Sequence, residues 1–565
     1  MAVHQRCKLL VGALLVLGVL GAPVSADERN DKAVQVSVLG TTDVHGHIYP
    51  TNYYHDAGDE ALGVARVQTL IKQERTRNPN VLLVDSGDCL QGTPLTYYHA
   101  RIATHAPNPM VAAYNLMGFD AFAIGNHEYN YGISYLEKAR RESRYPFLSA
   151  NIYHHGTDKL VYRPWIIKTV DQVRIGVIGF TTPGVAVWDR KHVSGKQDFG
   201  DIVVAAKREI PRVKAAGVDA IVVIIHSGLG APYDSTFSGY AADEGIPEEN
   251  ACAHLAEACP DIDAILLGHS HKDLPKLLHH GVLLTQAKKW GERLAVVDLT
   301  FKKVDDRWRL TGKDARTLST EGVPPDEAIL AASRQAHEAT LRYVRTPIAR
   351  SSVAWTGIGA RTQDIPLMDL ISEVQREAAQ AQLSAVSVFN SNAHLPKGRI
   401  TVADLAALYV YENTLTRIRL TGQQLRDYLE FSASFYKPYA PGGLIFDDSQ
   451  PAYNQDLVAG VDYTIDVRQP VGSRIVGLRY QGQDVMPKQA FTMAVNSYRQ
   501  NGGGGYTMLK QATLEKSDFP EIRELLIEQV KRWRTISPEK VFKANWRLLP
   551  ADGVASDGRH YQAVN

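Results

Sequence analysis

Six short apolar runs between residues 34 and 267 constrain the fold more than any other feature of the sequence. They are rich in Val and Ile, they are bounded by Gly, Asp or Asn, and they lie at 34–39, 81–84, 121–124, 175–180, 221–225 and 265–267. This pattern is typical of buried strands. Amphipathic stretches such as 64–76 and 133–143 lie between the runs and predict helices. Alternating strands and helices indicate an α/β sandwich.

Five of the six runs lead directly into potential metal ligands. The segments that follow them are Thr41-Thr42-Asp43-Val44-His45, Asp85-Ser86-Gly87-Asp88, Gly125-Asn126-His127-Glu128, His226-Ser227-Gly228 and Gly268-His269-Ser270-His271. Residues at the carboxyl ends of strands form the sites of open α/β sheets. A single buried Asp or His at one strand end would usually be satisfied by backbone groups. Five strand ends that all carry Asp, Asn or His instead predict one shared site.

The residue types at these strand ends suit a pair of metal ions. Two divalent cations about 3.5–4 Å apart need one bridging anion and several further ligands each. Asp88 is the natural bridge because its carboxylate has two oxygens. Imidazole and carboxylate ligands suit Zn, Mn, Fe or Co, and these segments offer no thiolate. We therefore expect two divalent metal ions, which bind phosphoryl groups and lower the pKa of bound water towards about 7. The identity of the metal stays open.

The ordered blocks Asp-Val-His, Gly-Asp, Gly-Asn-His-Glu, His-Ser-Gly and Gly-His-Ser-His resemble those of the calcineurin-like binuclear metallophosphoesterases. Together with the region after residue 345, the chain is similar to secreted bacterial nucleotidases. It is most similar to their 2′,3′-cyclic-nucleotide 2′-phosphodiesterase/3′-nucleotidase branch, and the resemblance covers nearly all of the chain after residue 26. It implies a four-layer α/β/β/α metallophosphoesterase sandwich, followed by a smaller α+β substrate-binding domain.

The resemblance also assigns roles to the residues of the blocks. Asp43, His45 and His271 would hold the first metal and Asn126, His226 and His269 the second, with Asp88 as the bridge. His127 would point at the scissile phosphate and either stabilise the transition state or protonate the leaving oxygen, as general acid catalysis requires. Many 5′-nucleotidases have an acidic residue three positions after this His. Here, as in the cyclic-phosphodiesterase branch, that position is Asn130, which can hydrogen-bond the ring but cannot compensate an imidazolium charge.

Two segments of the second domain suit a nucleobase. Tyr411 is followed two residues later by Asn413, and Tyr498 precedes a run of four glycines that includes Gly503. In secreted nucleotidases, aromatic residues at the positions of Tyr411 and Tyr498 sandwich the base. The resemblance therefore implies that these tyrosines stack on it, each contributing about 1–3 kcal/mol. Asn413 would read a base edge, and the glycine loop would let backbone approach the ligand.

Two departures from the 5′-nucleotidase pattern bear on the substrate. Where those enzymes often have a Gly-rich segment ending in Ile-Arg, this chain has residues 390–399, and the phosphate-holding Arg is out of register. An Asp that often meets the ribose is replaced by Gly504. Both departures are compatible with the cyclic-nucleotide/3′-nucleotidase branch. We expect a phosphoesterase that hydrolyses 2′,3′-cyclic nucleotides, 3′- or 5′-mononucleotides, or several of these, to nucleosides and phosphate. A 5′-nucleotidase or UDP-sugar hydrolase proper remains the alternative.

Other classes of protein fit less well. A thiosulfate-ester hydrolase of sulfur oxidation uses a related scaffold, but the paired tyrosines favour a nucleobase. A degenerate relative that serves as an adhesin or a metal-binding protein would have lost ligands, and all seven predicted ligand positions are filled. The net charge is only +1, without the clustered basic residues of a protein that binds duplex nucleic acid. We therefore expect a small nucleotide as the partner, and the oligomeric state stays open.

The sequence also predicts export and a division into segments. Residues 1–26 combine Arg6 and Lys8 with an apolar run at 9–20 and small residues near position 26, which is typical of a cleaved signal peptide. The apolar run is too short to span a bilayer, so a secreted or periplasmic protein without a stable membrane anchor is expected. The segments that we predict beyond the signal peptide are a metallophosphoesterase domain at 27–323, a connecting helix at 324–345, a substrate-binding domain at 346–550 and a tail at 551–565.

Overall fold

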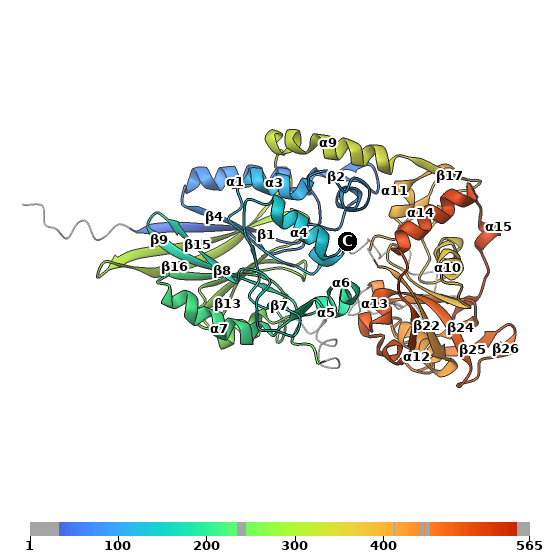
Figure 1. Cartoon of the computed structure of the whole chain (residues 1–565). Helices are drawn as coiled ribbons and strands as arrows, with labels where there is room; N and C mark the ends of the chain where they lie inside the picture. Colours follow the sequence, from blue (N-terminus) through green and yellow to red (C-terminus); the bar gives the residue numbers. More distant parts are fainter. Residues whose placement is uncertain (1–32, 234–244, 412, 441–445, 447–451, 551–565) are drawn as a thin grey trace, which may run out of the picture.

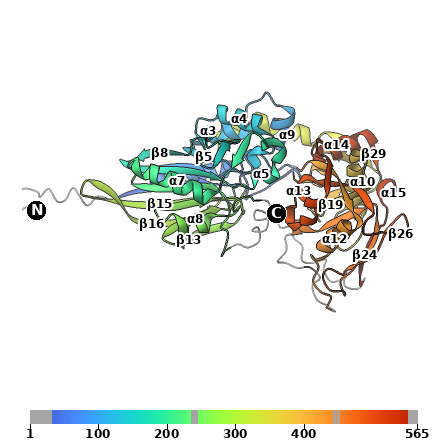
Figure 2. The same cartoon turned by 60° about the horizontal axis from the view of Figure 1, so that its bottom comes forward.

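The computed structural model describes residues 33–233, 245–411, 413–440, 446 and 452–550. The predicted signal peptide (1–26) and tail (551–565) lie outside the described residues. The described chain forms a first lobe (residues 34–319) and a second lobe (347–549) that lie next to each other, with helix α9 (Glu327–Val344) running between them along one side (Figure 1). Figure 2 shows the same two lobes from a second direction.

Two six-stranded sheets stack face to face in the first lobe. The first sheet has the strand order β16 (Arg307–Ser319), β15 (Arg293–Val304), β1 (Val34–Thr41), β4 (Val81–Asp85), β5 (Ala121–Ala123) and β6 (Phe147–Leu148). The second has the order β13 (Asp273–His279), β14 (Val282–Ala287), β12 (Ala264–Leu267), β11 (Ala220–His226), β9 (Val173–Thr181) and β8 (Trp165–Val170). Four neighbouring strands run parallel in each sheet: β1, β4, β5 and β6 in the first, and β9, β11, β12 and β14 in the second.

Both faces of each sheet are buried, which explains why the strands read as continuous apolar runs. On β4, Leu82 and Val84 pack between the two sheets, whereas Leu83 faces the outer helices. The helices that cover the first sheet are α1 (Val64–Arg77), α3 (Pro109–Met117), α4 (Ile133–Glu142) and α9, and those on the second are α7 (Ile202–Ala215) and α8 (Cys252–Ala258). The expected four-layer α/β/β/α sandwich is confirmed.

The second lobe is built around a five-stranded mixed sheet with its own apolar core. Its strand order is β23 (Asp456–Ala459), β19 (Leu383–Ser387), β27 (Ala490–Asn496), β22 (Leu415–Thr421) and β28 (Thr513–Lys516). The main helices of this lobe are α10 (Pro366–Ala379), α12 (Gly422–Ala433) and α14 (Ile522–Trp533). A four-stranded sheet consists of β26 (Gln483–Asp484), β25 (Ile475–Tyr480), β24 (Asp462–Asp466) and β30 (Trp546–Leu549). This is the smaller α+β unit that the sequence predicts.

The six strands and the two helices expected from the apolar patterns are all present, and their ends agree within two residues. The agreement follows from burial, because residues that pack on both sides must be apolar along the whole strand. Within the part of the chain that the structure describes, no helix is long and apolar enough to cross a membrane.

Candidate metal centre and active site

The carboxyl ends of the parallel strands meet at the edge of the sandwich that faces the second lobe. In the first sheet, Thr41 at the end of β1 pairs with Asp85 at the end of β4; in the second, Thr181 of β9 pairs with His226 of β11. The loops that follow these ends bring the sequence-predicted ligands together at this edge: Asp43, His45, Asp88, Asn126, His226, His269 and His271.

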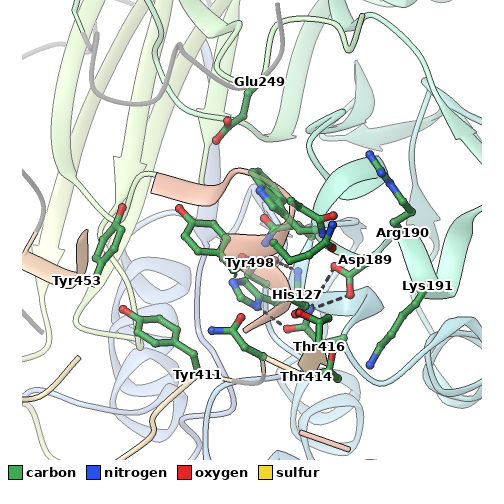
Figure 3. Close-up of a pocket in the computed structure, with 18 of the residues that line it drawn as sticks. His127, Asp189, Arg190, Lys191, Glu249, Tyr411, Thr414, Thr416, Tyr453 and Tyr498 are labelled. Atoms are coloured by element: carbon green, nitrogen blue, oxygen red, sulfur yellow. Dashed lines mark hydrogen bonds and ion pairs between the residues drawn. The ribbon is translucent and has the colours of Figure 1, made fainter. Parts of the chain in front are cut away.

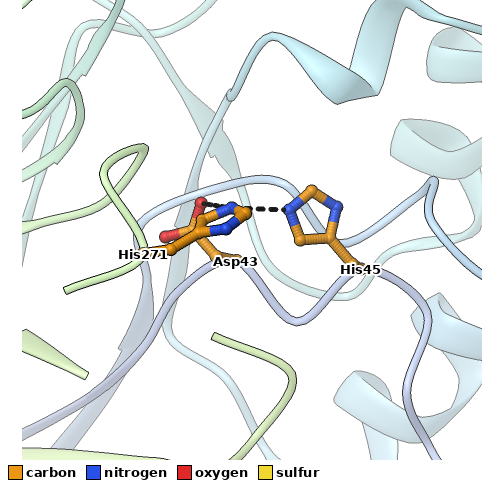
Figure 4. A group of neighbouring side chains, drawn as sticks. All are labelled: Asp43, His45 and His271. Carbon is orange, nitrogen blue, oxygen red and sulfur yellow. Dashed lines mark hydrogen bonds and ion pairs between the residues drawn. The ribbon is translucent and has the colours of Figure 1, made fainter. Parts of the chain in front are cut away.

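Asp43, His45 and His271 form the first cluster (Figure 4). Nε2 of His271 lies 3.4 Å from Oδ1 of Asp43 and 3.1 Å from Nε2 of His45. Nδ1 of His45 lies 3.0 Å from the carbonyl oxygen of Gln91 and must donate to it, because a carbonyl only accepts. This bond directs Nε2 towards the cluster, as is usual for a metal-ligating histidine.

Asp88 and His226 form the second cluster together with Asp43. Nε2 of His226 lies 2.9 Å from Oδ2 of Asp88 and 3.9 Å from Oδ1 of Asp43. Its Nδ1 donates to the carbonyl oxygen of Ser86 at 2.8 Å. Oδ1 of Asp88 accepts the backbone N–H of His127 at 2.8 Å, so Oδ2 is the oxygen that faces the histidines. Oδ2 is therefore the oxygen of Asp88 that would contact cations held by these histidines, whereas the sequence analysis expected both oxygens to take part.

Three observations show that these residues fit a pair of cations. The ligand atoms of each cluster lie within 4.8 Å of one another. Oδ1 of Asn126 is buried and accepts no hydrogen bond from any described residue. Left-handed backbone, which is uncommon outside glycine, occurs at five of the seven predicted ligands: Asp43, His45, Asp88, His269 and His271. Such strain clusters at functional sites.

Burial and neighbouring charges set the protonation of the clusters. Burial opposes ionisation of Asp88, but His226 and His127 outweigh it and hold the pKa of this carboxyl well below its usual value. Burial, reinforced by His127, lowers the pKa of His45 well below that of a free imidazole. An ionised carboxylate and a neutral imidazole are the forms that bind metal. Burial also acts to lower the pKa of His226, yet Asp88 and Asp43 overcome it and raise the pKa to about 10, so metal binding there must displace a proton.

His269 lies beside the second cluster, with its ring centroid 5.2 Å from that of His226. Its Nε2 is 2.8 Å from Oε1 of Glu249, so a carboxylate holds the ring at that nitrogen. A carboxylate bonded to the outer nitrogen of a ligating histidine fixes the ring and raises its basicity. Glu249 is in that position, and the sequence analysis missed it because it follows none of the apolar runs.

Glu128 holds the loop that carries Asp88. The side chain is fully buried. Its carboxylate accepts four backbone N–H groups at 2.7–3.1 Å, those of Asp88, Cys89, Leu90 and Gly125. A carboxylate with four such bonds orients the loop, and this geometry gives it no free oxygen edge for proton transfer.

Replacing Glu128 with Gln should therefore destabilise the protein. The amide has one acceptor oxygen and turns its own N–H groups towards backbone donors. We expect the free energy of unfolding to fall by about 3–5 kcal/mol, as when one partner of a buried charged network is removed. Urea unfolding measures the change. The matched control is Glu338→Gln on α9, whose exposed carboxylate lies 4.0 Å from Arg342. This substitution should change the free energy of unfolding by less than about 1 kcal/mol. A Glu128→Gln protein as stable as the wild type would contradict the orienting role.

His127 lies between the ligands and the open space in front of them. It begins the short 3-10 turn η3 (His127–Tyr129). Nε2 lies 4.0 Å from Oδ2 of Asp88, and the side chain is 31% exposed. Nδ1 lies 2.6 Å from Oδ1 of Asn130. A ring held at Nδ1 and accessible at Nε2 has the arrangement that a general acid needs.

A cavity of about 450 Å³ lies between the two lobes at this site (Figure 3). The first lobe lines it with predicted ligands and with His127, and the second lobe lines it with Tyr411, Asn413 and Tyr498. Tyr411 is 41% exposed, and Phe389 packs against its ring with the centroids 4.7 Å apart. The structure thus brings the predicted metal site and the predicted base-binding side chains into one space.

Gly503 lies behind Tyr498 and not on the cavity wall. A Cβ at residue 503 would lie 2.6 Å from the ring of Tyr498, so glycine lets the ring take its position. The fully buried Arg499 pairs with Asp456 at 2.8 Å and donates to the carbonyls of Gly503 and Tyr453 at 3.0 and 2.6 Å. Arg499 therefore ties the glycine loop to the segment that carries Tyr453.

Among the cavity-lining residues that the sequence analysis missed are Trp188, Asp189 and Tyr453. Trp188 and Asp189 come shortly after β9, the strand whose run at 175–180 is followed by no ligand type. Their place after a predicted strand could have identified them, because the carboxyl end of β9 lies at the same edge of the sandwich as the ends of the other five predicted strands. Tyr453, a third tyrosine at the cavity, belongs to no pattern that the sequence analysis used.

Sequence models of two protein families match the chain: calcineurin-like phosphoesterase at residues 36–273, and 5′-nucleotidase C-terminal domain at residues 347–511. The chain is 30% identical to the 2′,3′-cyclic-nucleotide 2′-phosphodiesterase/3′-nucleotidase of Salmonella typhimurium, over 94% of this chain and 91% of that protein. It is 29% identical to the trifunctional nucleotide phosphoesterase protein YfkN of Bacillus subtilis, over 98% of this chain, and spans 41% of the length of YfkN. A candidate 5′-nucleotidase of Staphylococcus aureus, solved in complex with α-ketoglutarate, superposes with a TM-score of 0.78 at 26% identity, over 91% of this chain and 100% of that one.

Proposed function

The chain belongs to the calcineurin-like phosphoesterases that carry a 5′-nucleotidase C-terminal domain, and we propose that it hydrolyses 2′,3′-cyclic nucleotides and 3′-nucleotides to nucleosides and phosphate. As a member of this family, it is a hydrolase of phosphate esters that uses two divalent metal ions. One observation carries the proposal: four of the predicted metal ligands and the two predicted base-binding tyrosines line the same cavity. The four ligands are Asp88, Asn126, His269 and His271.

The side chains of the first lobe suit hydrolysis of a phosphate ester. The residues that would hold one ion are Asp43, His45 and His271, and those for the other are Asn126, His226 and His269, with Asp88 shared. Two divalent ions polarise the phosphoryl oxygens and provide a nucleophilic water near neutral pH. The chain's own contribution is to orient both sets of ligands, through the bonds of His45 to Gln91 and of His226 to Ser86.

His127 would supply the proton for the leaving group. Its Nε2–H would donate to the ester oxygen as the P–O bond breaks, so that the sugar leaves as an alcohol. With a 2′,3′-cyclic nucleotide, water adds to phosphorus and the P–O2′ bond breaks, giving a 3′-nucleotide. With a 3′-nucleotide, the P–O3′ bond breaks, giving a nucleoside and inorganic phosphate. The two reactions differ only in the ribose oxygen that faces His127.

Two observations favour this branch over 5′-nucleotides. Gly504 has left-handed backbone, and a Cβ there would lie 2.1 Å from Oδ1 of Asn454, so an Asp at this position would need the loop to move. Arg399, on β21 (Gly398–Thr401), is not among the described residues that line the cavity. The activity for which the Salmonella relative is named supports the same branch. The Staphylococcus structure, a candidate 5′-nucleotidase, makes that activity the second candidate.

A substrate panel tests the proposal. Purified metal-loaded protein is assayed with 2′,3′-cyclic AMP, 3′-AMP, 5′-AMP, a UDP-sugar and bis-p-nitrophenyl phosphate. We expect the highest kcat/KM for the first two. A highest value for 5′-AMP or the UDP-sugar would replace the proposal with the second candidate, and activity on the aryl ester alone would contradict nucleotide hydrolysis.

Replacing Tyr411 or Tyr498 with Ala should raise KM for nucleotides about tenfold to a hundredfold, because one stacking face contributes about 1–3 kcal/mol. Hydrolysis of bis-p-nitrophenyl phosphate should change little, since that substrate does not need the base-binding side chains. Steady-state kinetics with both substrates measure the difference, and Tyr480→Ala, on β25 and outside the cavity lining, is the matched control. Equal losses on both substrates would mean that the tyrosines support the lobes, and no loss on either would place the base elsewhere.

We also propose that the protein acts outside the cytoplasm, in the periplasm or as a secreted enzyme. The support is the pattern of residues 1–26 alone, which lie outside the described residues. Mass spectrometry of protein from the extracytoplasmic fraction should find a chain that begins at Asp27. An uncleaved chain in the cytoplasm would contradict the proposal.

A further inference from the structure

His127 is linked to a buried carboxylate through Asn130. Nδ1 of His127 lies 2.6 Å from Oδ1 of Asn130. The other end of this amide, Nδ2, lies 3.1 and 3.3 Å from the two oxygens of Asp189. The sequence predicts the hydrogen bond between His127 and Asn130, but it predicts no negative charge next to Asn130. The structure supplies that charge from a residue 59 positions further along the chain.

The chemistry of the three groups fixes the direction of both hydrogen bonds. An ionised carboxylate only accepts, so the Asn130 amide must turn its N–H groups towards Asp189. Oδ1 of Asn130 then faces the ring, and an amide oxygen also only accepts. Nδ1 of His127 must therefore carry a hydrogen. Nε2 is left as the nitrogen that exchanges a proton on the cavity side.

The carboxylate of Asp189 is buried at a position that the fold defines. The residue is 4% exposed. It lies between the short helices α5 (Val185–Trp188) and α6 (Arg190–Val193), where its backbone N–H donates to Val185 and its carbonyl accepts from His192. Burial raises the pKa of Asp189 to about 6, against the opposing effects of Asn130 and His127.

We propose that Asp189 is a positioning residue that acts through Asn130 to fix the tautomer and the orientation of His127. The importance of this link for nucleotides rests on the proposed function, whereas the link itself does not. Family members with an acidic residue in place of Asn130 have the charge next to the ring. In this chain the carboxylate of Asp189 is separated from the ring of His127 by the neutral amide of Asn130, and the two hydrogen bonds of that amide connect the carboxylate to the ring.

Four variants separate charge from shape. Asp189→Asn keeps the volume and an acceptor for Asn130 but removes the charge. Asp189→Ala removes both. The double variant Asn130→Asp/Asp189→Asn moves the carboxylate next to the ring and restores one acid and one amide. Asp198→Asn, which removes a surface carboxylate paired with His155, is the matched control.

Aryl phosphates provide the kinetic readout, because they do not depend on the nucleobase. Phenyl phosphate needs a proton on its leaving oxygen more than 4-nitrophenyl phosphate does. We expect Asp189→Asn to lower kcat about tenfold to a hundredfold on phenyl phosphate, the range typical of an outer partner, with a smaller loss on 4-nitrophenyl phosphate and little change in KM. The double variant should recover most of the loss, and Asp198→Asn should match the wild type.

Three results would overturn the inference: equal losses on both aryl phosphates, no loss on either, or a double variant no better than Asp189→Asn. Nitrogen NMR of histidine-labelled protein, with His127→Gln for assignment, reports the tautomer independently of activity. Nδ1–H is expected in the wild type and a mixture in Asp189→Ala, and an Nε2–H wild type would refute the link. A wild type that hydrolyses aryl phosphates but no nucleotide would overturn the proposed function and leave the link standing.

Discussion

Asp88→Asn should remove most of the bound metal and nearly all of the activity. Oδ2 of Asp88 lies 2.9 Å from Nε2 of His226 and within 4.0 Å of Nε2 of both His45 and His127. Oδ1 is already engaged by the backbone N–H of His127. An Asn would keep its oxygen on that N–H and turn its NH2 group towards the cations. We expect metal affinity to fall by more than about a hundredfold, beyond the range that outer partners show.

Metal analysis of the purified variant, together with its rate on 2′,3′-cyclic AMP, measures both effects. Asp261→Asn is the matched control, since it removes an exposed carboxylate that pairs with Lys214 on the surface. It should keep the wild-type metal content and rate. Two bound metals and full activity in Asp88→Asn would disprove its role as the bridge.

His127→Ala should lower turnover far more than it lowers metal content. General acid catalysis contributes about 10²–10⁴-fold to a rate, and the ring is fixed at Nδ1 by Asn130 rather than by a backbone carbonyl. The alternative is that His127 is itself a metal ligand, because the ligand atoms of His45, Asp88 and His127 lie within 4.8 Å of one another. His127 is the most exposed of the three.

The comparison with His226→Ala decides between the two roles. His226 is fully buried and its Nε2 faces the shared carboxylate oxygen at 2.9 Å, so its loss should deplete metal. His127→Ala should retain metal and lose about a hundredfold or more in kcat, with the larger loss on nucleotides than on 4-nitrophenyl phosphate. If both variants lose metal equally, His127 is a ligand and the acid must be sought elsewhere.

The sequence predicts the sandwich and the place of the site for the same physical reason. A strand buried on both faces must be apolar, so Leu82, Leu83 and Val84 identify β4 by their residue types alone. Parallel strands end at one edge, so the polar residues that follow them must meet there. The pattern of strands in the sequence is therefore enough to predict that Asp43 and Asp88 lie close together, although they are far apart in sequence.

The features of the site that the sequence does not predict depend on the orientation of side chains and on the local path of the backbone, which the spacing of residues in the sequence does not determine. Asp88 presents one oxygen because a left-handed turn and the backbone N–H of His127 fix its carboxylate. Asp189 reaches Asn130 only because the chain after β9 folds back through two short helices. Gly503 packs behind Tyr498, a relation that depends on the local path of the glycine loop.

A product-resolved time course with 2′,3′-cyclic AMP tests the central claim most directly. The protein is stripped with a chelator, reloaded with Mn²⁺ or Zn²⁺, and its products are separated by chromatography. The account predicts that the reloaded protein forms 3′-AMP first and adenosine with phosphate later, while the stripped protein forms neither. Equal rates with and without metal, or no turnover of any nucleotide by fully loaded protein, would contradict it.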